Sequence, residues 1–169
     1  MLELILGGAR SGKSRYAESR AVDGERVYIA TATAGDGEMA TRIARHRDDR
    51  GPHWQTVEEP IALARVLQQH AAPGRVVLVD CLTLWLTNLL LSDDRDVFAR
   101  ERAALLTWLP AHRGHVVFVS NEVGQGVVPM DALSRRFVDE SGWLHQELAQ
   151  FCDRVVFVTA GLPQVLKES

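Results

Sequence analysis

Five short runs of apolar, mostly β-branched residues recur along the chain and constrain its fold more than any other feature. Each run is nearly continuous in hydrophobicity instead of alternating with polar residues, which is typical of strands buried on both faces of a parallel sheet. Segments with helical periodicity separate the runs, as expected for right-handed crossovers. The sequence therefore predicts an α/β fold with three α/β/α layers and a mostly parallel central sheet. The runs are LELIL from Leu2, RVYIAT from Arg26, RVVLVD from Arg75, HVVFVS from His115 and RVVFVTAG from Arg154.

The length of the chain and its helical segments favour a single domain over residues 1–169. A chain of this length can bury one substantial core and is short for two. Helical patterns follow the first strand at 14–24 and the second at 36–51, and they precede the third strand at 60–74 and the last at 131–152. Residues 81–112 hold one or two further helices, and the segment HWQTVEEP could add a short edge strand. No internal repeat or linker interrupts this order.

Composition excludes several classes of protein. Hydrophobic residues make up 46% of the chain and charged residues 24%, which is ordinary globular usage. A net charge of −3 gives no general attraction to nucleic acid or to an anionic membrane. Two cysteines without paired spacing suggest neither a zinc site nor a disulfide framework, and no apolar run is long enough to span a membrane. We therefore expect a cytoplasmic protein.

A glycine-rich segment, GGARSGKS, follows the first predicted strand and opens a helix. It fits the pattern G-x-x-x-x-G-K-[ST] with Gly7, Gly12, Lys13 and Ser14. In such a P-loop the backbone N–H groups surround the phosphates, the lysine neutralises their charge, and the hydroxyl holds Mg²⁺. A glycine-rich turn with an exposed lysine is the alternative, but the strand and helix on either side favour the P-loop. The fold is therefore expected to be P-loop NTPase-like.

Asp80 ends the predicted strand RVVLVD. P-loop enzymes use an acid at the end of another strand on the metal side of the site, so Asp80 is the candidate carboxylate for Mg²⁺. An aspartate at a strand-to-helix junction can also cap the helix that follows. The two roles are compatible, and the P-loop favours the first.

Four arginines surround a histidine in the stretch RIARHRDDRGPHW. If residues 38–50 are helical, His46 shares a polar face with Arg42 and Arg50, at spacings of four residues, and points away from the core. Nearby positive charge disfavours the protonated form of His46, and a neutral imidazole is a nucleophile. Taken alone, the pattern is more often a solvated helix face, with Asp48 and Asp49 neutralising the arginines.

The segment SNEVGQGVVP follows the fourth predicted strand. Two glycines and a proline around Asn121 and Glu122 predict a tight loop at the carboxyl end of a strand, where α/β sheets bind ligands. The roles of Asn121 and Glu122 stay open. No NKxD sequence occurs, so the residues do not choose between ATP and GTP.

Taken together, these motifs resemble the bifunctional adenosylcobinamide kinase/adenosylcobinamide-phosphate guanylyltransferase family of cobalamin biosynthesis. The resemblance covers almost the whole chain and rests on GGARSGKS, YIATAT, the E-M-x-x-R-I-x-x-H-R-x-x-R-G-x-x-W run, T-V-E-E-P and NEVGQGVVP, in that order. The HRxxRGxxW element is far more specific than a P-loop. His145–Gln146 is a departure, because an Asn–Gln pair often occurs there.

The resemblance implies two reactions. The first phosphorylates the aminopropanol hydroxyl of adenosylcobinamide, and the second transfers GMP from GTP to that phosphate through a GMP–histidine intermediate at His46, releasing pyrophosphate. We expect Lys13 and His46 to be the catalytic residues, and Ser14 and Asp80 to hold Mg²⁺. The resemblance also implies a homotrimer. The implied nucleotide contacts are Gly7, Gly8, Ala9, Arg10, Ser11, Gly12, Lys13, Ser14, Thr31, Ala32, Thr33, Arg47, Asp48, Asp49, Arg50, Glu58 and Asp80.

Two other functions remain alternatives at this point. A plain P-loop small-molecule kinase would leave His46 as a surface residue with no covalent step. A RecA-like nucleotide-binding module that acts on nucleic acid is disfavoured by the acidic net charge and the lack of a second basic, aromatic-rich face.

Overall fold

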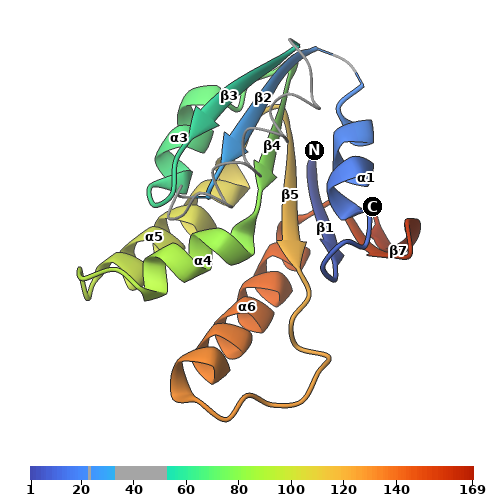
Figure 1. The fold of residues 1–169 in the computed structure, drawn as a ribbon. Helices are drawn as coiled ribbons and strands as arrows, with labels where there is room; N and C mark the ends of the chain where they lie inside the picture. Colours follow the sequence, from blue (N-terminus) through green and yellow to red (C-terminus); the bar gives the residue numbers. More distant parts are fainter. Residues whose placement is uncertain (23, 33–52) are drawn as a thin grey trace.

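The protein folds around one central sheet. The computed structural model describes residues 1–22, 24–32 and 53–169, and within them the sheet has seven strands in the order β3-β2-β4-β5-β1-β6-β7 (Figure 1). The strands are β1 (Leu2–Gly7), β2 (Glu25–Ala30), β3 (Trp54–Glu58), β4 (Arg75–Asp80), β5 (His115–Asn121), β6 (Arg154–Thr159) and β7 (Leu162–Glu168). The first six run parallel to their neighbours, and β7 runs antiparallel to β6.

All five predicted apolar runs form strands. Every residue of β1 is buried, and the middle residues of β4 and β5 are buried as well, so helices or loops cover both faces of these central strands. The predicted edge strand in HWQTVEEP is confirmed as β3, which pairs only with β2 among the strands described. The mostly parallel sheet of the predicted fold class is therefore confirmed.

The antiparallel strand β7 was not predicted. A two-residue turn joins β6 to β7, and both of its residues have positive φ, 53° at Ala160 and 78° at Gly161. Two consecutive positive φ values are the requirement of a type I′ hairpin turn, and glycine adopts such a conformation without a steric penalty. The Ala-Gly pair between the last apolar run and the segment LPQVLKE was a local signal for this hairpin.

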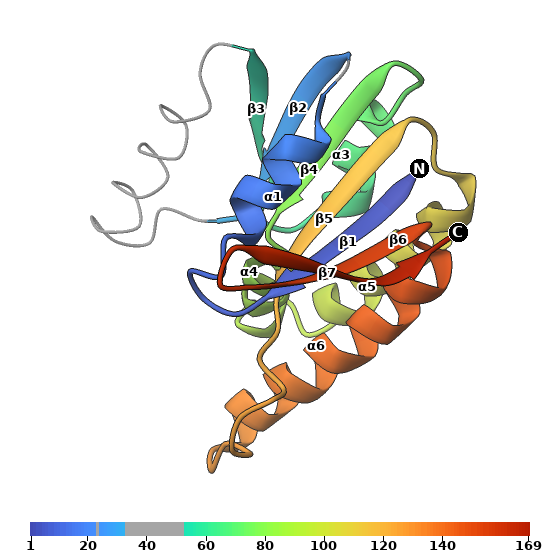
Figure 2. The ribbon, with the colours of Figure 1, turned by 90° about the vertical axis from the view of Figure 1, so that its right-hand side faces the viewer.

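Helices cover the two faces of the sheet unequally. In the part of the chain that the structure describes, α1 covers one face, and the other described helices cover the opposite face (Figure 2). The helices are α1 (Lys13–Arg20), α3 (Leu63–His70), α4 (Leu82–Leu90), α5 (Val97–Trp108) and α6 (Ala132–Phe151), with a short 3-10 turn at Leu109–Ala111. Residues 81–112 thus hold two helices, and the predicted helix at 36–51 lies outside the described residues. No described helix has the length and apolar content needed to span a membrane.

Two apolar clusters, one on each side of the sheet, form the core. The larger lies between the sheet and α3 to α6 and includes Leu4, Phe118 and the fully buried Trp85. The smaller lies beneath α1 and includes Ile5, Ala17 and Val117. Burial of this apolar area on both faces is the main stabilising contribution to such a fold.

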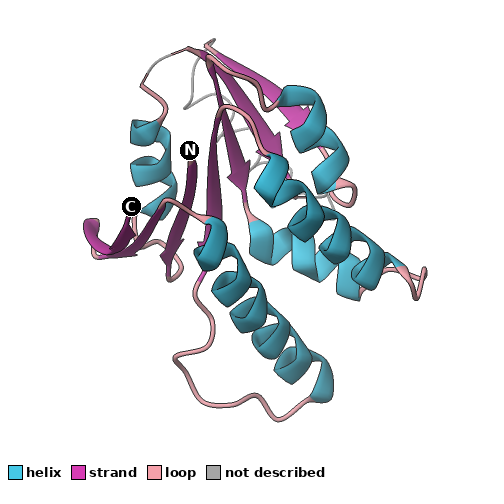
Figure 3. Cartoon of the chain, turned by 180° about the vertical axis from the view of Figure 1, so that it is seen from behind, coloured by secondary structure: helices cyan, strands magenta, loops and turns pink. Residues whose placement is uncertain are grey.

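The loops that follow the parallel strands lie at one edge of the sheet. Because parallel strands share a direction, the loops after β1, β2, β4 and β5 emerge at the same edge. The loop from β5 to α6 is long (Figure 3). It leads to α6, which Asp131 caps by accepting a hydrogen bond from the Ser134 N–H at 2.8 Å. The predicted site residues that lie within the described ranges are at this edge.

Candidate functional site

The segment GGARSGKS forms a tight loop between β1 and α1. Arg10 and Gly12 both have positive φ, 56° and 93°, so the backbone reverses within a few residues. A Cβ added at Gly7 would lie 2.5 Å from the Ser11 Oγ and 2.6 Å from the Val158 carbonyl oxygen. Close packing at Gly7 and the positive φ at Gly12 therefore favour glycine at these two positions, as expected of a P-loop that presents its backbone to phosphates.

Two neighbouring segments hold the P-loop by backbone hydrogen bonds. The Glu122 N–H, just after β5, donates to the Gly7 carbonyl at 3.1 Å, and the Gly161 N–H in the hairpin turn donates to the Ser11 carbonyl at 2.8 Å. Lys13, the first residue of α1, donates from Nζ to the Gly8 carbonyl at 3.1 Å. The lysine ammonium thus lies against the loop whose bound phosphates it is predicted to neutralise.

Asp80 ends β4 at the same edge of the sheet. Its Oδ2 accepts a hydrogen bond from the Tyr28 hydroxyl at 3.0 Å. The N-cap residue of α4 is Cys81, and no side chain caps that helix, so the capping role considered for Asp80 is not observed. Burial, and then the nearby charge of Asp80, raise the pKa of the Cys81 thiol, while Lys13 acts in the opposite direction. Lys13 and Asp80 are therefore both close enough to the Cys81 thiol for their charges to influence its pKa.

The Thr31 side chain, just after β2, is hydrogen-bonded to Cys81, the residue after β4. Its hydroxyl donates to the Cys81 carbonyl at 2.7 Å and accepts from the Cys81 N–H at 2.9 Å, and its side chain is fully buried. The Asn88 amide donates to the Thr31 carbonyl at 2.8 Å. The hydroxyl is thus engaged within the protein, so a contact between Thr31 and a nucleotide stays a prediction.

Asn121 ends β5, between the P-loop strand and β4. Its Nδ2 donates to the Thr83 Oγ1 at 3.2 Å, and that hydroxyl also lies 3.1 Å from the Cys81 Sγ. The Asn121 Oδ1 is buried and has no hydrogen-bond partner among the described residues. A buried carbonyl oxygen of this kind ordinarily has a partner, so it is an acceptor at the site edge that a ligand could satisfy.

Glu58 ends the edge strand β3 and is exposed. It lies in register with Ala30 of β2, which is in register with Asp80 of β4, so both carboxylates occupy the same edge. The adjacent Glu59 is instead used structurally. Burial raises its pKa, but hydrogen bonds from the N–H groups of Ile61 and Ala62 outweigh this and lower it below its ordinary value.

The structure brings the P-loop, Thr31, Ala32, Glu58 and Asp80 to one edge of the sheet. Six predicted site residues lie outside the described residues: Thr33, His46, Arg47, Asp48, Asp49 and Arg50. The contacts of Tyr28, Thr83 and Gly161 at this edge were not predicted, because they depend on long-range packing.

Within the described ranges, no group of three or more His, Cys, Asp or Glu residues could hold a metal ion by itself. Mg²⁺ is commonly bound by one or two protein oxygens together with substrate phosphates and water, so one hydroxyl and one carboxylate suit it. Ser14, the second residue of α1, and Asp80 supply such a pair.

Comparison with known proteins relates the whole chain to one family. A family model described as cobinamide kinase / cobinamide phosphate guanyltransferase matches residues 3–166. The bifunctional adenosylcobalamin biosynthesis protein CobP of Pseudomonas aeruginosa is 60% identical over 169 residues, which cover 99% of this chain and 98% of that protein. The protein CobU of Escherichia coli is 40% identical over 181 residues, covering 99% and 100%.

The fold also resembles that of a solved structure with little sequence similarity. The P4 protein from bacteriophage phi6, in complex with ADP, superposes with a TM-score of 0.53 at 15% identity, covering 96% of this chain and 52% of that one. At this identity the likeness concerns the fold alone.

Proposed function

Because this chain belongs to the cobinamide kinase / cobinamide phosphate guanyltransferase family, we propose that its single P-loop binds the nucleotide for both reactions. The chain is a bifunctional enzyme of adenosylcobalamin biosynthesis, a kinase and a guanylyltransferase. The observation that carries the proposal is the tight GGARSGKS loop, which Lys13 crosses, at the edge where β4 and β5 also end. A cytoplasmic location is part of the same proposal.

In the kinase reaction, the aminopropanol hydroxyl of adenosylcobinamide attacks the γ-phosphorus of GTP, and the bond from that phosphorus to its bridging oxygen breaks. ATP as an alternative donor stays open. The Lys13 ammonium, which lies against the Gly8 carbonyl of the P-loop, would neutralise the phosphates. The Ser14 hydroxyl and the Asp80 carboxylate would hold Mg²⁺, which supplies further charge neutralisation when bound.

In the guanylyltransferase reaction, we assign the nucleophile to His46 on the HRxxRGxxW motif. A ring nitrogen attacks the α-phosphorus of GTP and pyrophosphate leaves. An oxygen of adenosylcobinamide phosphate then attacks the same phosphorus, the P–N bond breaks, and adenosylcobinamide-GDP forms. Arg47 and Arg50 would stabilise negative charge on the phosphates in both steps.

The remaining binding assignments follow from the family resemblance. They comprise the P-loop from Gly7 to Ser14, Thr31 to Thr33, Arg47 to Arg50, Glu58 and Asp80 as nucleotide contacts. A homotrimer is also proposed, in which the His46 segment lies near a neighbouring subunit.

Labelling with GTP that carries its label on the α-phosphate tests the covalent step. The wild type should retain label after denaturation, and this label should be lost in acid and kept in alkali, because a phosphoramidate is hydrolysed in acid. His46→Ala should abolish it, whereas His53→Ala, which changes an exposed histidine of the described chain, should not. Full labelling of His46→Ala would place the nucleophile elsewhere, and an unlabelled wild type would favour a kinase with no covalent step.

A further inference from the structure

Glu122 is a carboxylate fixed beside the P-loop without an assigned role. It follows β5, whose last residue, Asn121, pairs in register with Gly7 of β1. The Glu122 N–H donates to the Gly7 carbonyl at 3.1 Å, so its backbone is bonded to the residue that opens the P-loop. The side chain is 22% exposed, and the end of β5 that it follows lies at the same edge of the sheet as Asp80.

Both oxygens of the Glu122 carboxylate are positioned from within the protein. Oε1 accepts a hydrogen bond from the Gly124 N–H at 2.6 Å, which bends the start of the loop back over the side chain. Oε2 lies 3.8 Å from the Nδ1 of His145 on α6. The carboxylate is thus held between its own loop and a helix distant in sequence.

His145 is buried, and its ring is orientated by one strong contact. Its side chain is 8% exposed, and its Nε2 lies 2.7 Å from the Ser120 Oγ. The Nδ1 is buried and has no hydrogen-bond partner among the described residues. Burial lowers the pKa of His145, although Glu122 opposes this, so the ring is neutral at neutral pH.

A neutral ring carries a proton on only one nitrogen. If the Ser120 hydroxyl donates to Nε2, the proton of His145 is on Nδ1 and points toward the Glu122 Oε2. This tautomer gives the buried Nδ1 an electrostatic partner and satisfies the Ser120 hydroxyl. Ser120 thereby orientates His145, and His145 orientates Glu122.

The same three side chains also have the order of a hydrolase triad, serine to Nε2 and acid to Nδ1. Ser120 is fully buried on the side of β5 that faces α6, so no substrate carbonyl can reach its hydroxyl. Of the three residues, Glu122 is the most exposed. Chemistry at this cluster therefore belongs to the carboxylate and not to the serine.

We propose that Glu122 accepts the proton of the cobinamide hydroxyl during the kinase reaction, and that His145 is the positioning residue that holds it. The hydroxyl oxygen forms a bond to the γ-phosphorus, its proton passes to a Glu122 oxygen, and the electron pair of the broken P–O bond stays on the departing nucleoside diphosphate. A carboxylate in this role is a recurring part of kinase sites.

The guanylyltransferase reaction makes no such demand. Its first nucleophile is an imidazole lone pair and its second is a phosphate oxygen, neither of which has a hydroxyl proton to lose. The inference rests on the proposed use of the P-loop for the kinase reaction. It goes beyond that proposal because it predicts that the Glu122 carboxylate is needed for the kinase reaction and not for the guanylyltransferase reaction.

Glu122→Gln tests the base. Glutamine keeps an oxygen for the Gly124 N–H but does not accept the substrate proton. Kinase kcat should fall by about 10²–10⁴-fold, while GMP transfer to preformed adenosylcobinamide phosphate stays within about twofold. Asp139→Asn, at an exposed carboxylate of α6, is the matched control and should change neither activity. Unchanged kinase activity in Glu122→Gln, or an equal loss of both activities, would overturn the proposal.

Two substitutions at His145 test the positioning role. Asparagine places an amide nitrogen near the position of Nδ1 and keeps a donor toward Glu122, whereas leucine removes it. We expect His145→Leu to lower kinase kcat on the order of tenfold to 100-fold, with the KM for GTP unchanged, and His145→Asn to keep most of the activity. The guanylyltransferase activity of each variant reports its folding. Equal kinase activity in the two variants would refute the positioning role.

Lys13→Ala separates failure of this inference from failure of the proposed function. If Lys13→Ala retains kinase activity, the P-loop assignment is wrong. If Lys13→Ala is inactive and Glu122→Gln is fully active as a kinase, the P-loop assignment stands and only the assignment of the base fails.

Discussion

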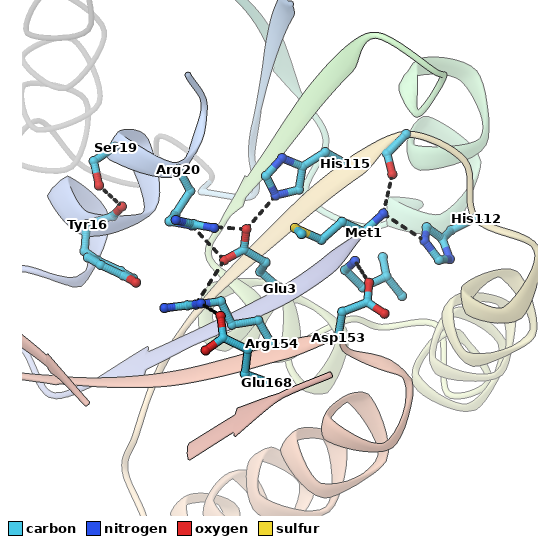
Figure 4. Close-up of polar contacts among 12 residues, drawn as sticks. Met1, Glu3, Tyr16, Ser19, Arg20, His112, His115, Asp153, Arg154 and Glu168 are labelled. Carbon is cyan, nitrogen blue, oxygen red and sulfur yellow. Dashed lines mark hydrogen bonds and ion pairs between the residues drawn. The ribbon is translucent and has the colours of Figure 1, made fainter. Parts of the chain in front are cut away.

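Replacing Glu3 with glutamine would remove a negative charge from beneath α1, at the end of β1 away from the P-loop. Glu3 is fully buried, and its two oxygens accept hydrogen bonds from the Arg20 Nε at 3.2 and 3.0 Å (Figure 4). The Nε2 of His115 lies 2.7 Å from Oε1, and the Nε of Arg154 lies 3.9 Å from Oε2. Arg20 is the last residue of α1, and Glu3 lies in β1. The cluster therefore holds α1 against β1, the two elements that the P-loop connects.

The magnitude follows from how the cluster is buried. Breaking a buried ion pair by removing one partner costs about 3–5 kcal/mol, since an uncompensated charge is left behind. The side chains of Arg20, His115 and Arg154 are 32%, 21% and 18% exposed, so they regain some hydration when Glu3 is neutralised. We therefore expect Glu3→Gln to lower the free energy of unfolding by about 3 kcal/mol, and Tm by roughly 6–12 °C.

Urea denaturation near neutral pH measures this difference, with Glu25→Gln as the control. Glu25 is 72% exposed and forms an ion pair with Arg75 at 2.6 Å. An exposed pair contributes at most about 1 kcal/mol, so the control should differ little from the wild type. A loss of stability in Glu3→Gln no greater than that in Glu25→Gln would refute the reasoning.

The pH dependence of this difference has a definite sign. Burial raises the pKa of Glu3, but hydrogen bonds from His115 and Arg20 outweigh it, and the pKa lies below the ordinary value of 4.5. A carboxyl with a lowered folded-state pKa stabilises the fold above its unfolded pKa, and this contribution is lost as the pH falls through the folded pKa. The gap between wild type and Glu3→Gln should therefore stay constant down to about pH 4.5 and close below it.

Three further predictions concern the P-loop edge. Lys13→Ala should lower both activities by at least about 100-fold with an unchanged circular dichroism spectrum, because one phosphate site serves both reactions; wild-type turnover would exclude this loop. Asp80→Asn should shift the Mg²⁺ titration of activity to higher concentration, and an unchanged titration would contradict a metal role. Gly7→Ala should lower thermal stability by about 1–3 kcal/mol, because its Cβ would lie 2.5 Å from the Ser11 Oγ and 2.6 Å from a backbone oxygen of β6. Gly8→Ala is the control, since a Cβ there meets nothing within 4 Å, and equal effects would contradict the packing argument.

Local patterns predicted most of the sheet and the edge at which Lys13 and Asp80 lie. The five apolar runs became β1, β2, β4, β5 and β6, because hydrophobicity along a few residues reports burial on both faces directly. Parallel strands then place their following loops at one edge, so the shared location of Lys13 and Asp80 followed from strand order and direction.

Contacts between distant residues were not predictable in this way. The Tyr28 hydroxyl reaches Asp80 from 52 positions away, and His145 reaches Ser120 from 25 positions away. Such pairs depend on strand register and helix packing, which no local spacing specifies. Asp80 shows the consequence: the sequence allowed a capping role, and only the structure showed that Asp80 accepts a bond from Tyr28 and that no side chain caps the start of α4.

The unpredicted hairpin of β6 and β7 contributes to the P-loop itself. The Gly161 N–H donates to the Ser11 carbonyl, and a Cβ at Gly12 would lie 3.1 Å from the Gly161 Cα, so the two backbones meet where Gly12 has little room for a side chain. On its other side the loop is bonded at Gly7 to Glu122. A loop held from both sides needs little rearrangement to present its N–H groups to a phosphate, which reduces the entropic cost of binding. The hairpin, which adds only an exposed edge strand to the sheet, therefore also supports the P-loop from one side.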